Sequence, residues 1–152
     1  MARFFSLVAI CLAFSAGLLS CAPDAERVAA SKAPSGPMVD IVDGLMTAFN
    51  DHDPDKMRRF WHEDVTWFEV TASGASVITP DAQALYDELV VYFETYPSVR
   101  STLEGVVVNG RFVAAVERSV WDEDGNRRSQ ASNVVYEIVD GRVKKFWYFP
   151  PQ

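Results

Sequence analysis

One carboxylate is a candidate for proton-transfer chemistry because of the short segment around it. Residues 65–70 read Val-Thr-Trp-Phe-Glu-Val, a composition rich in β-branched and aromatic residues that predicts a strand. Side chains alternate between the two faces of a strand, so Trp67 and Glu69 share one face. If Trp67 faces an apolar interior, Glu69 does too, and burial makes a carboxyl a better general base near neutral pH. Glu69 is therefore the candidate catalytic residue.

Two other interpretations of Glu69 stay open. In the first, Phe68 is the buried aromatic residue, and Glu69 lies in solvent or pairs with Arg118 across the sheet; strand glutamates are mostly exposed. In the second, Glu69 lies in a pocket but only holds a ligand through a hydrogen bond.

Aromatic side chains make up 12% of the chain, and some of them are candidates for the walls of a pocket. Rings around an open cavity favour a flat apolar ligand, which polar atoms of Tyr and Trp then orient. The alternative is that most of these rings fill the core or a dimer interface. The candidate pocket residues are Trp61, Trp67, Tyr86, Asn133, Tyr136 and Trp147.

The sequence offers no convincing metal or cofactor motif. His52 and His62 have acidic neighbours, but helical or strand spacing does not bring three ligands to one point. Residues 122–126 resemble a calcium loop only superficially, because Arg127 stands where that loop requires Gly. There is no Gly-rich phosphate loop and no Ser-centred nucleophile elbow. We expect no metal and no cofactor.

The charge balance argues against nucleic-acid binding. The chain carries 14 Lys and Arg against 21 Asp and Glu, a net charge of −7. Its basic residues occur as isolated pairs, whereas phosphate contacts need a concentrated positive face. Two cysteines are too few for a disulfide scaffold or a Cys-rich zinc site.

The first 20 residues are predicted to be a signal peptide. Arg3 gives a positive start, and the apolar run over residues 4–19 spans about 24 Å as a helix, less than the roughly 30 Å of a bilayer core. Residues 18–21, Leu-Leu-Ser-Cys, resemble a bacterial lipobox, in which Cys21 becomes the lipid-bearing first residue. The alternative is a plain secretory signal.

This resemblance predicts a lipid-anchored protein of the bacterial cell envelope. Because Ala22 rather than Asp follows the cysteine, the expected location is the periplasmic side of the outer membrane in a Gram-negative cell, and otherwise the protein is secreted. Residues 21–37 are rich in Pro, Ser and Ala and predict a flexible tether. The folded domain is expected over residues 38–152.

The domain begins with helical patterns and continues as a meander of strands. Apolar residues at three- and four-residue spacing predict a helix over 38–50, and Asp53 is placed to cap a second helix that starts at Pro54. After the strand at 65–70, Thr79-Pro80-Asp81 signals a third helix, with Thr79 as its cap and Pro80 in its first turn. Pro97 ends that helix.

Beyond Pro97 the periodicity changes from 3.6 to 2. Asn109-Gly110 and Asp140-Gly141 predict two-residue hairpin turns, and residues 122–126 predict a longer one. Strands are expected near 100–108, 111–121, 127–139 and 142–149. The resulting order, α-α-β-α-β-β-β-β, predicts an α+β fold in which helices pack on one face of an antiparallel sheet.

From about Val39 to Phe149 the chain resembles the SnoaL-like and ketosteroid-isomerase-like branch of the nuclear-transport-factor-2-like superfamily. The residues that carry the resemblance are 48–53 (Ala-Phe-Asn-Asp-His-Asp), 60–67 (Phe-Trp-His-Glu-Asp-Val-Thr-Trp), the helix entry at 79–82 and the hairpin at 140–143. It implies a cone, in which a curved sheet wraps around helices and leaves an apolar pocket open at one end. It also implies a homodimer formed through the outer sheet face.

The resemblance places Glu69 where ketosteroid isomerases hold their proton-shuttling carboxylate. Those enzymes also need an oxyanion hole, formed by a first-helix Tyr and a late-strand Asp. Here Leu45 lies near the position of the Tyr, and Asn133 is the closest polar residue to that of the Asp. Without those donors, steroid isomerisation by the familiar mechanism is not expected.

Three functions fit these patterns. The first is a lipid-anchored envelope module that binds a small apolar molecule or a partner in its cone. The second is an enzyme of isomerase, cyclase, dehydratase or hydrolase type that uses Glu69 as a general base on a hydrophobic substrate. The third is a dimeric assembly domain without a ligand. A buried carboxylate with a second convergent polar group would favour the enzyme.

Overall fold

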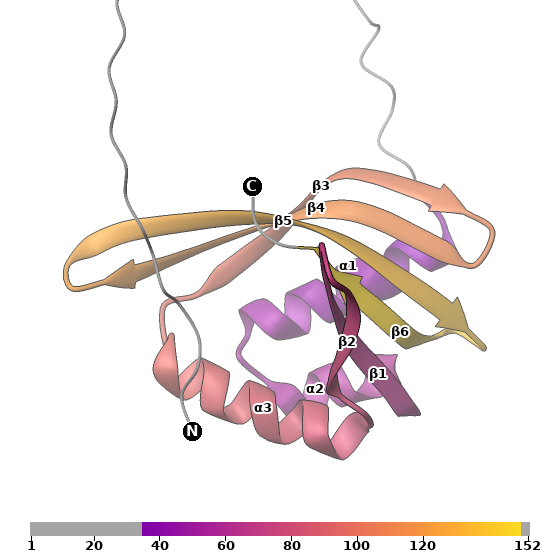
Figure 1. Cartoon of the computed structure of the whole chain (residues 1–152), viewed down its shortest axis with the longest axis horizontal. Helices are drawn as coiled ribbons and strands as arrows, with labels where there is room; N and C mark the ends of the chain where they lie inside the picture. Colours follow the sequence, from indigo (N-terminus) through magenta and orange to yellow (C-terminus); the bar gives the residue numbers. More distant parts are fainter. Residues whose placement is uncertain (1–34, 150–152) are drawn as a thin grey trace, which may run out of the picture. The chain divides into compact units, whose positions relative to one another are not determined.

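A computed structural model of the chain describes residues 35–149; the predicted signal peptide, the lipobox with Cys21 and most of the tether lie outside these described residues. The described residues form three α-helices, a short 3-10 helix and one six-stranded sheet (Figure 1). The elements are α1 (Pro37–Asn50), α2 (Pro54–Met57), η1 (Arg58–Phe60), β1 (Trp61–Thr71), β2 (Gly74–Thr79), α3 (Ala82–Thr95), β3 (Arg100–Asn109), β4 (Phe112–Glu123), β5 (Asn126–Val139) and β6 (Arg142–Tyr148).

Carboxylate side chains begin the second and third helices. Asp53 accepts a hydrogen bond from the Lys56 backbone N–H at 2.9 Å, and Pro54 opens α2, as the sequence predicts. The predicted cap of the third helix is wrong by two residues. Asp81, not Thr79, accepts hydrogen bonds from the backbone N–H groups of Gln83 and Ala84, each at 2.9 Å, while Thr79 ends β2.

The fold class is confirmed as α+β with a curved sheet, but the sheet is mixed rather than antiparallel throughout. Its strand order is β2-β1-β6-β5-β4-β3, and β1 pairs with β6 in parallel. The sequence also missed β2, which forms a hairpin with β1. Most β2 side chains are exposed, so this strand has no alternating apolar pattern by which sequence could reveal it.

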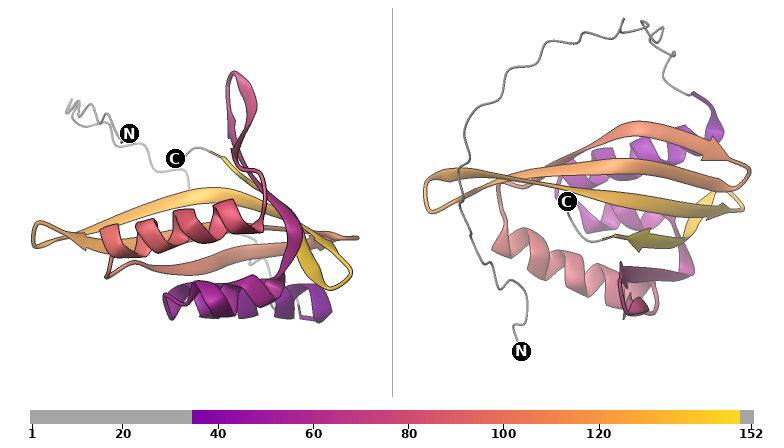
Figure 2. Two further views of the ribbon diagram at one scale, coloured as in Figure 1. Left: turned by 90° about the horizontal axis from the view of Figure 1, so that it is seen from below. Right: turned by 45° about the horizontal axis from the view of Figure 1, so that its top comes forward.

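All three α-helices cover the same face of the sheet. α1 contacts β3 and β4, whereas α3 contacts β1 and β2. Figure 2 shows the β1–β2 hairpin turning away from the direction of β3, β4 and β5, so the sheet curls around the helices. This face is the inner face from here on, and the opposite one is the outer face. The core lies between inner face and helices, with Val42, Val65, Leu85, Val99, Val113, Val134, Ile138 and Val143 at most 2% exposed.

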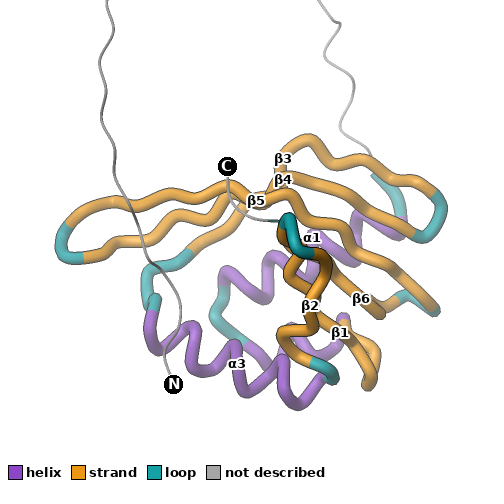
Figure 3. The backbone as a smooth tube through the Cα atoms, in the orientation of Figure 1, coloured by secondary structure: helices purple, strands orange, loops and turns teal. Residues whose placement is uncertain are grey.

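Tight turns set the register of the three hairpins that follow α3 (Figure 3). Asp140 and Gly141 have φ of 49° and 74°, the left-handed pair that a two-residue hairpin turn requires. Asp124 and Gly125 repeat this pattern, so the turn predicted to be longer also has two residues. The first turn is shifted by one residue, to Gly110 and Arg111, because Asn109 pairs with Phe112. No helix in residues 35–149 is long and apolar enough to span a membrane.

Candidate functional site

A buried carboxyl lies in the middle of the inner face, on β4. Alternate side chains of this strand, at Val113, Ala115 and Glu117, point inward and are buried. Glu117 is only 5% exposed, although glutamate is seldom buried without a partner. Glu117 thus follows two buried apolar residues on the inward-pointing side of β4, and we take this acidic group as the centre of the candidate site.

Hydroxyl groups from neighbouring strands surround Glu117. Ser132 of β5 lies directly opposite it in the strand register, and Ser101 of β3 lies opposite Ser119. The hydroxyls of Ser101 and Ser119 are 2.7 Å apart. From β6, the Tyr148 hydroxyl donates a hydrogen bond to Oε2 of Glu117. We call these five residues the carboxyl cluster.

Burial raises the pKa of Glu117 to about 7, while hydrogen bonds from Ser101 and Ser119 oppose the rise by favouring the ionised form. Burial, reinforced by the negative charge of Glu117, also raises the pKa of Tyr92 to about 12 and that of Tyr136 well above its ordinary value. Near neutral pH, therefore, both protonation states of Glu117 are populated, while Tyr92 and Tyr136 keep their protons.

Half-buried aromatic side chains flank the carboxyl cluster on both sides. On one side, the Trp67 ring lies 5.9 Å from that of Phe146 and 6.0 Å from that of Tyr148. On the other side, the Tyr96 ring lies 5.1 Å from that of Tyr92 and 6.1 Å from that of Trp121. We call Trp67, Tyr92, Tyr96 and Trp121 the ring group.

The ring group contains two unused hydrogen-bond donors. The indole Nε1 atoms of Trp67 and Trp121 are buried and have no hydrogen-bond partner among residues 35–149. A buried N–H without an acceptor is costly, and buried tryptophans normally find one. Together with Glu117, these atoms give the inner face both donors and an acceptor for a polar group of a bound molecule.

Glu69 lies on the inner face, near the ring group. In the parallel β1–β6 register, Trp67 lies opposite Phe146 and Glu69 opposite Tyr148, so the two share the inner face as strand parity predicts. Phe68 lies on the outer face, where its ring stacks on that of Trp147 at 5.6 Å. Glu69 is half-buried and forms no side-chain hydrogen bond or ion pair with any described residue.

Arg118 does not pair with Glu69. Its side chain lies on the outer face, where Nε is 2.8 Å from a carboxylate oxygen of Glu104. The catalytic role of Glu69 stays a prediction, since position alone does not assign it.

The structure brings only some of the predicted pocket residues to the inner site. Trp67 is in the ring group, and Tyr136 is buried close enough to feel the charge of Glu117. Asn133 and Trp147 face the other way, because Ser132 and Val134 point inward on β5 and Phe146 and Tyr148 do so on β6.

The remaining two predicted residues lie elsewhere. Trp61 is 3% exposed and borders a groove of about 500 Å³ between the starts of β1 and α3, which Arg58 and Arg142 also line. Tyr86 is half-buried on α3, with the Arg58 guanidinium 5.7 Å from its ring centre.

Sequence reasoning missed Glu117, although a local signal for it exists. The residues at 113, 115, 117, 119 and 121 are Val, Ala, Glu, Ser and Trp, and the residues between them include Arg118. Strict alternation from the buried Val113 places Glu117 inward and Arg118 outward.

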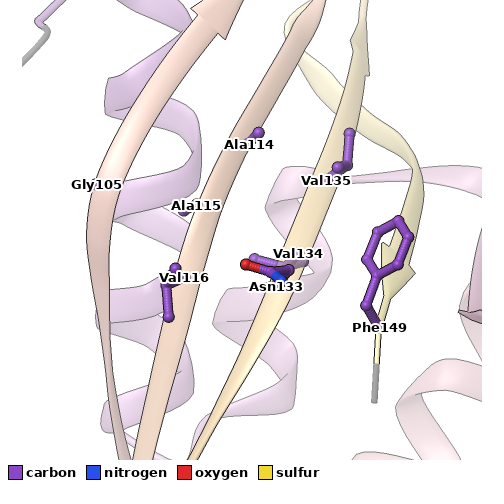
Figure 4. Close-up of a pocket in the computed structure, with 8 residues that line it drawn as sticks. All are labelled: Gly105, Ala114, Ala115, Val116, Asn133, Val134, Val135 and Phe149. Atoms are coloured by element: carbon purple, nitrogen blue, oxygen red, sulfur yellow. The ribbon is translucent and has the colours of Figure 1, made fainter. Parts of the chain in front are cut away.

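The outer face carries a shallow apolar groove of about 370 Å³ (Figure 4). The side chains of Ala114, Val116 and Val135 form its floor, and Asn133 and Phe149 border it on the β5–β6 side. Its lining residues are Gly105, Ala114, Ala115, Val116, Asn133, Val134, Val135 and Phe149. Next to it, Val107 is 60% exposed, and it lies opposite Ala114 in the strand register.

Comparison with known proteins relates the chain to one domain family. The family profile of the SnoaL-like domain matches residues 42–146. No curated protein sequence matches the chain significantly. Among solved structures, a loop-truncated variant of IdmH, from Streptomyces antibioticus, superimposes with a TM-score of 0.64 at 19% identity, covering 73% of this chain and 90% of its own.

Two further structures give similar values. TerC, co-crystallised with polyporic acid, has a TM-score of 0.62 at 14% identity and covers 74% of this chain and 90% of its own. A protein assigned as a SnoaL-like polyketide cyclase from Jannaschia sp. CCS1 has a TM-score of 0.63 at 18% identity, covering 78% and 90%. At these identities the likeness shows a shared fold.

Proposed function

Since the chain belongs to the SnoaL-like domain family, we propose that its inner face binds a small, largely apolar molecule that carries a carbonyl or hydroxyl group. The observation that carries this proposal is Glu117, a buried carboxyl that accepts a hydrogen bond from Tyr148. A buried titratable group with a perturbed pKa, next to half-buried rings, is typical of a binding or catalytic site.

The chemistry of the surrounding atoms supports this class of ligand. The ring group offers flat apolar surfaces, and the unused indole N–H groups of Trp67 and Trp121 suit an acceptor oxygen. Glu117 can accept a hydrogen bond when ionised and donate one when protonated, and both forms are populated near pH 7.

Indole N–H signals in a ¹H–¹⁵N NMR spectrum test the proposal directly, because the chain has four Trp residues. We expect 1-tetralone, a bicyclic aromatic ketone, to shift the signals of Trp67 and Trp121. Trp147, on the outer face, is the internal control and should not move. If only Trp147 shifts, or if no indole signal moves at millimolar ketone, the inner face is not the binding site.

A second candidate function is acid–base catalysis, which the pKa of Glu117 favours. A base whose pKa lies near the working pH transfers protons efficiently. In this proposal the Glu117 carboxylate takes a proton from the carbon next to a ligand carbonyl and returns it to the same molecule, while an inner-face donor stabilises the enolate oxygen. Glu69, on the same face, remains the alternative base.

Deuterium exchange separates these bases without knowledge of the natural substrate. In D₂O, catalysed proton abstraction would incorporate deuterium into 1-tetralone next to its carbonyl, which NMR or mass spectrometry detects. We expect Glu117→Gln to slow this exchange by about 10²-fold or more and Glu69→Gln to leave it unchanged. The reverse pattern would assign the role to Glu69, and exchange no faster than in buffer would contradict catalysis.

We further propose that the protein is anchored to the cell envelope and pairs with a second copy. The anchor proposal rests on the lipobox at residues 18–21. The pairing proposal is supported by the outer-face groove and by the exposure of Val107 beside it, because an apolar patch of this kind favours association.

A further inference from the structure

The turn between α1 and α2 lies against the open edge of the sheet. β3 is the last strand in the sheet order, so the backbone groups along its free edge have no neighbouring strand. Asn50 meets two of them: its Nδ2 donates to the Ser101 carbonyl at 2.8 Å, and its Oδ1 accepts from the Ser101 N–H at 2.7 Å. The side-chain amide thus takes the place of a peptide group on a further strand.

His52 contacts the chain two residues before Ser101, at Val99, which directly precedes β3. Its Nε2 lies 2.7 Å from the Val99 carbonyl. Alternate residues of a strand direct their backbone groups to the same side, so contacts at 99 and 101 match the strand period. His52 has a φ of 53°, an uncommon value for a residue other than glycine, and this turn of the chain follows directly on Asn50 and Asp51.

The contact from Asn50 continues into the interior through Ser101. This residue is 1% exposed, and its hydroxyl lies 2.7 Å from that of Ser119. Both hydroxyls also favour the ionised form of Glu117 and so lower its pKa against the effect of burial. Asn50 therefore binds the backbone of Ser101 at the sheet edge, while the Ser101 side chain belongs to the carboxyl cluster on the inner face.

We propose that Asn50 is a positioning residue for the carboxyl cluster: by holding the edge strand at Ser101, it keeps the Ser101 hydroxyl on Glu117. The inference deepens the proposed function, because positioning matters only if the carboxyl cluster is a working site. The family resemblance includes Asn50 in the motif at residues 48–53 but implies no role for it.

Other groups that face Glu117 must be considered when its ionisation is used as a readout. Tyr92 faces it from α3, Tyr136 from β5 and Tyr148 from β6, while Glu69 of β1 shares the inner face. The buried side chains of α1 are apolar. None of these groups is changed in the variants below, so a change in Glu117 reports on Ser101 and Asn50.

The test is a ¹³C NMR titration of the Glu117 carboxyl, assigned by its loss in Glu117→Gln. We expect Ser101→Ala and Asn50→Ala each to raise the pKa of Glu117 by roughly 0.5 to 1, because the ionised form loses a hydrogen bond. The double variant should move no further than Ser101→Ala alone. The matched control is His52→Ala, which removes the neighbouring contacts with Val99, Arg100 and the Phe93 ring but none with Ser101, and should leave the titration unchanged.

Two outcomes would overturn the proposal. One is an Asn50→Ala protein that is less stable to urea but titrates like the original, and the other is an equal change in His52→Ala. If Asn50→Ala does not fold, the same Glu117 titration is measured on Asn50→Ser, with an osmolyte such as sarcosine added to stabilise the fold. The titration needs no ligand, so it fails or succeeds separately from the indole experiment.

Discussion

The hydroxyl of Tyr148 donates a hydrogen bond to the carboxyl of Glu117 across the width of β5. Neighbouring strands lie about 4.8 Å apart, so the two backbones are separated by roughly 10 Å. Only long side chains that lean over a concave face can meet at this separation. The curvature of the sheet and the chemistry of its inner face therefore depend on each other.

The stability of the domain should fall as pH rises from 4.5 to about 7. Burial raises the pKa of Glu117 from 4.5 to about 7, so in this window the folded chain holds a proton that the unfolded chain has released. The free energy of unfolding, measured in urea, should decrease by about 3 kcal/mol across the window and be flat on either side of it.

Glu117→Gln, which cannot titrate, should remove this slope. Glu104, the other glutamate of β3 and β4 with a shifted pKa, does not interfere, because hydrogen bonding to Arg118 lowers its pKa and so moves its effect below the window. A slope that persists in Glu117→Gln would show that another group titrates there.

Charge on the outer face should prevent self-association. Val107→Lys places an ammonium group beside the outer-face groove, and because Val107 is 60% exposed the fold should tolerate it. We expect sedimentation velocity to show a dimer for the original chain and a monomer for the variant. Val77→Lys, at a site on β2 that is 53% exposed, is the control and should stay dimeric. A monomeric original chain at tens of micromolar would rule out the pairing.

Lipid attachment at Cys21 predicts a clear change in fractionation. Cys21→Ser should move the protein from the membrane fraction to the soluble fraction of the cell envelope. The variant lacks the cysteine that carries the acyl chains, and stable anchoring needs more than one such chain. Cys11→Ser, within the predicted signal peptide, should leave both anchoring and the mass of the mature protein unchanged. Persistence of Cys21→Ser in membranes would contradict the lipobox.

Gly44 should not tolerate alanine, although it lies inside α1. A Cβ atom there would lie 2.6 Å from Cε1 and Cζ of the Phe60 ring. Helix propensity favours alanine by about 1 kcal/mol, but overpacking costs about 1–3 kcal/mol, so we expect Gly44→Ala to lower the melting temperature. In a Phe60→Leu background, which lacks those ring atoms, the loss should disappear. An equal loss in both backgrounds would exclude the clash as its cause.

Local sequence signals predicted most of the elements well. Asp53 with Pro54 starts a helix, and Asp140 with Gly141 makes a hairpin turn, because each depends on the chemistry of adjacent residues. β2 and the parallel β1–β6 pair were missed. β2 lies in a local hairpin but shows no alternating apolar pattern, and the β1–β6 pair joins segments that are far apart in the sequence.

The site was harder to predict because the inward face of a strand depends on its register. Asn133 and Tyr136 are three residues apart, so they cannot both point inward from a regular strand. Ser132, the residue next to Asn133, is the one that is buried on the inner face. The inward position of Glu117 was predictable from sequence, because the alternation that buries Val113 and Ala115 continues to Glu117.

The place of β6 in the sheet order has a consequence for how the molecule is made. Among the described residues, the strand that comes last in the sequence is not at the rim of the sheet but joins the β2–β1 hairpin to the β5–β4–β3 meander. Removal of the final strand would leave two fragments with no shared backbone ladder, instead of one slightly smaller sheet. The sheet therefore cannot grow stepwise from β1 as the chain is made, and its two parts stay separate until β6 has been synthesised.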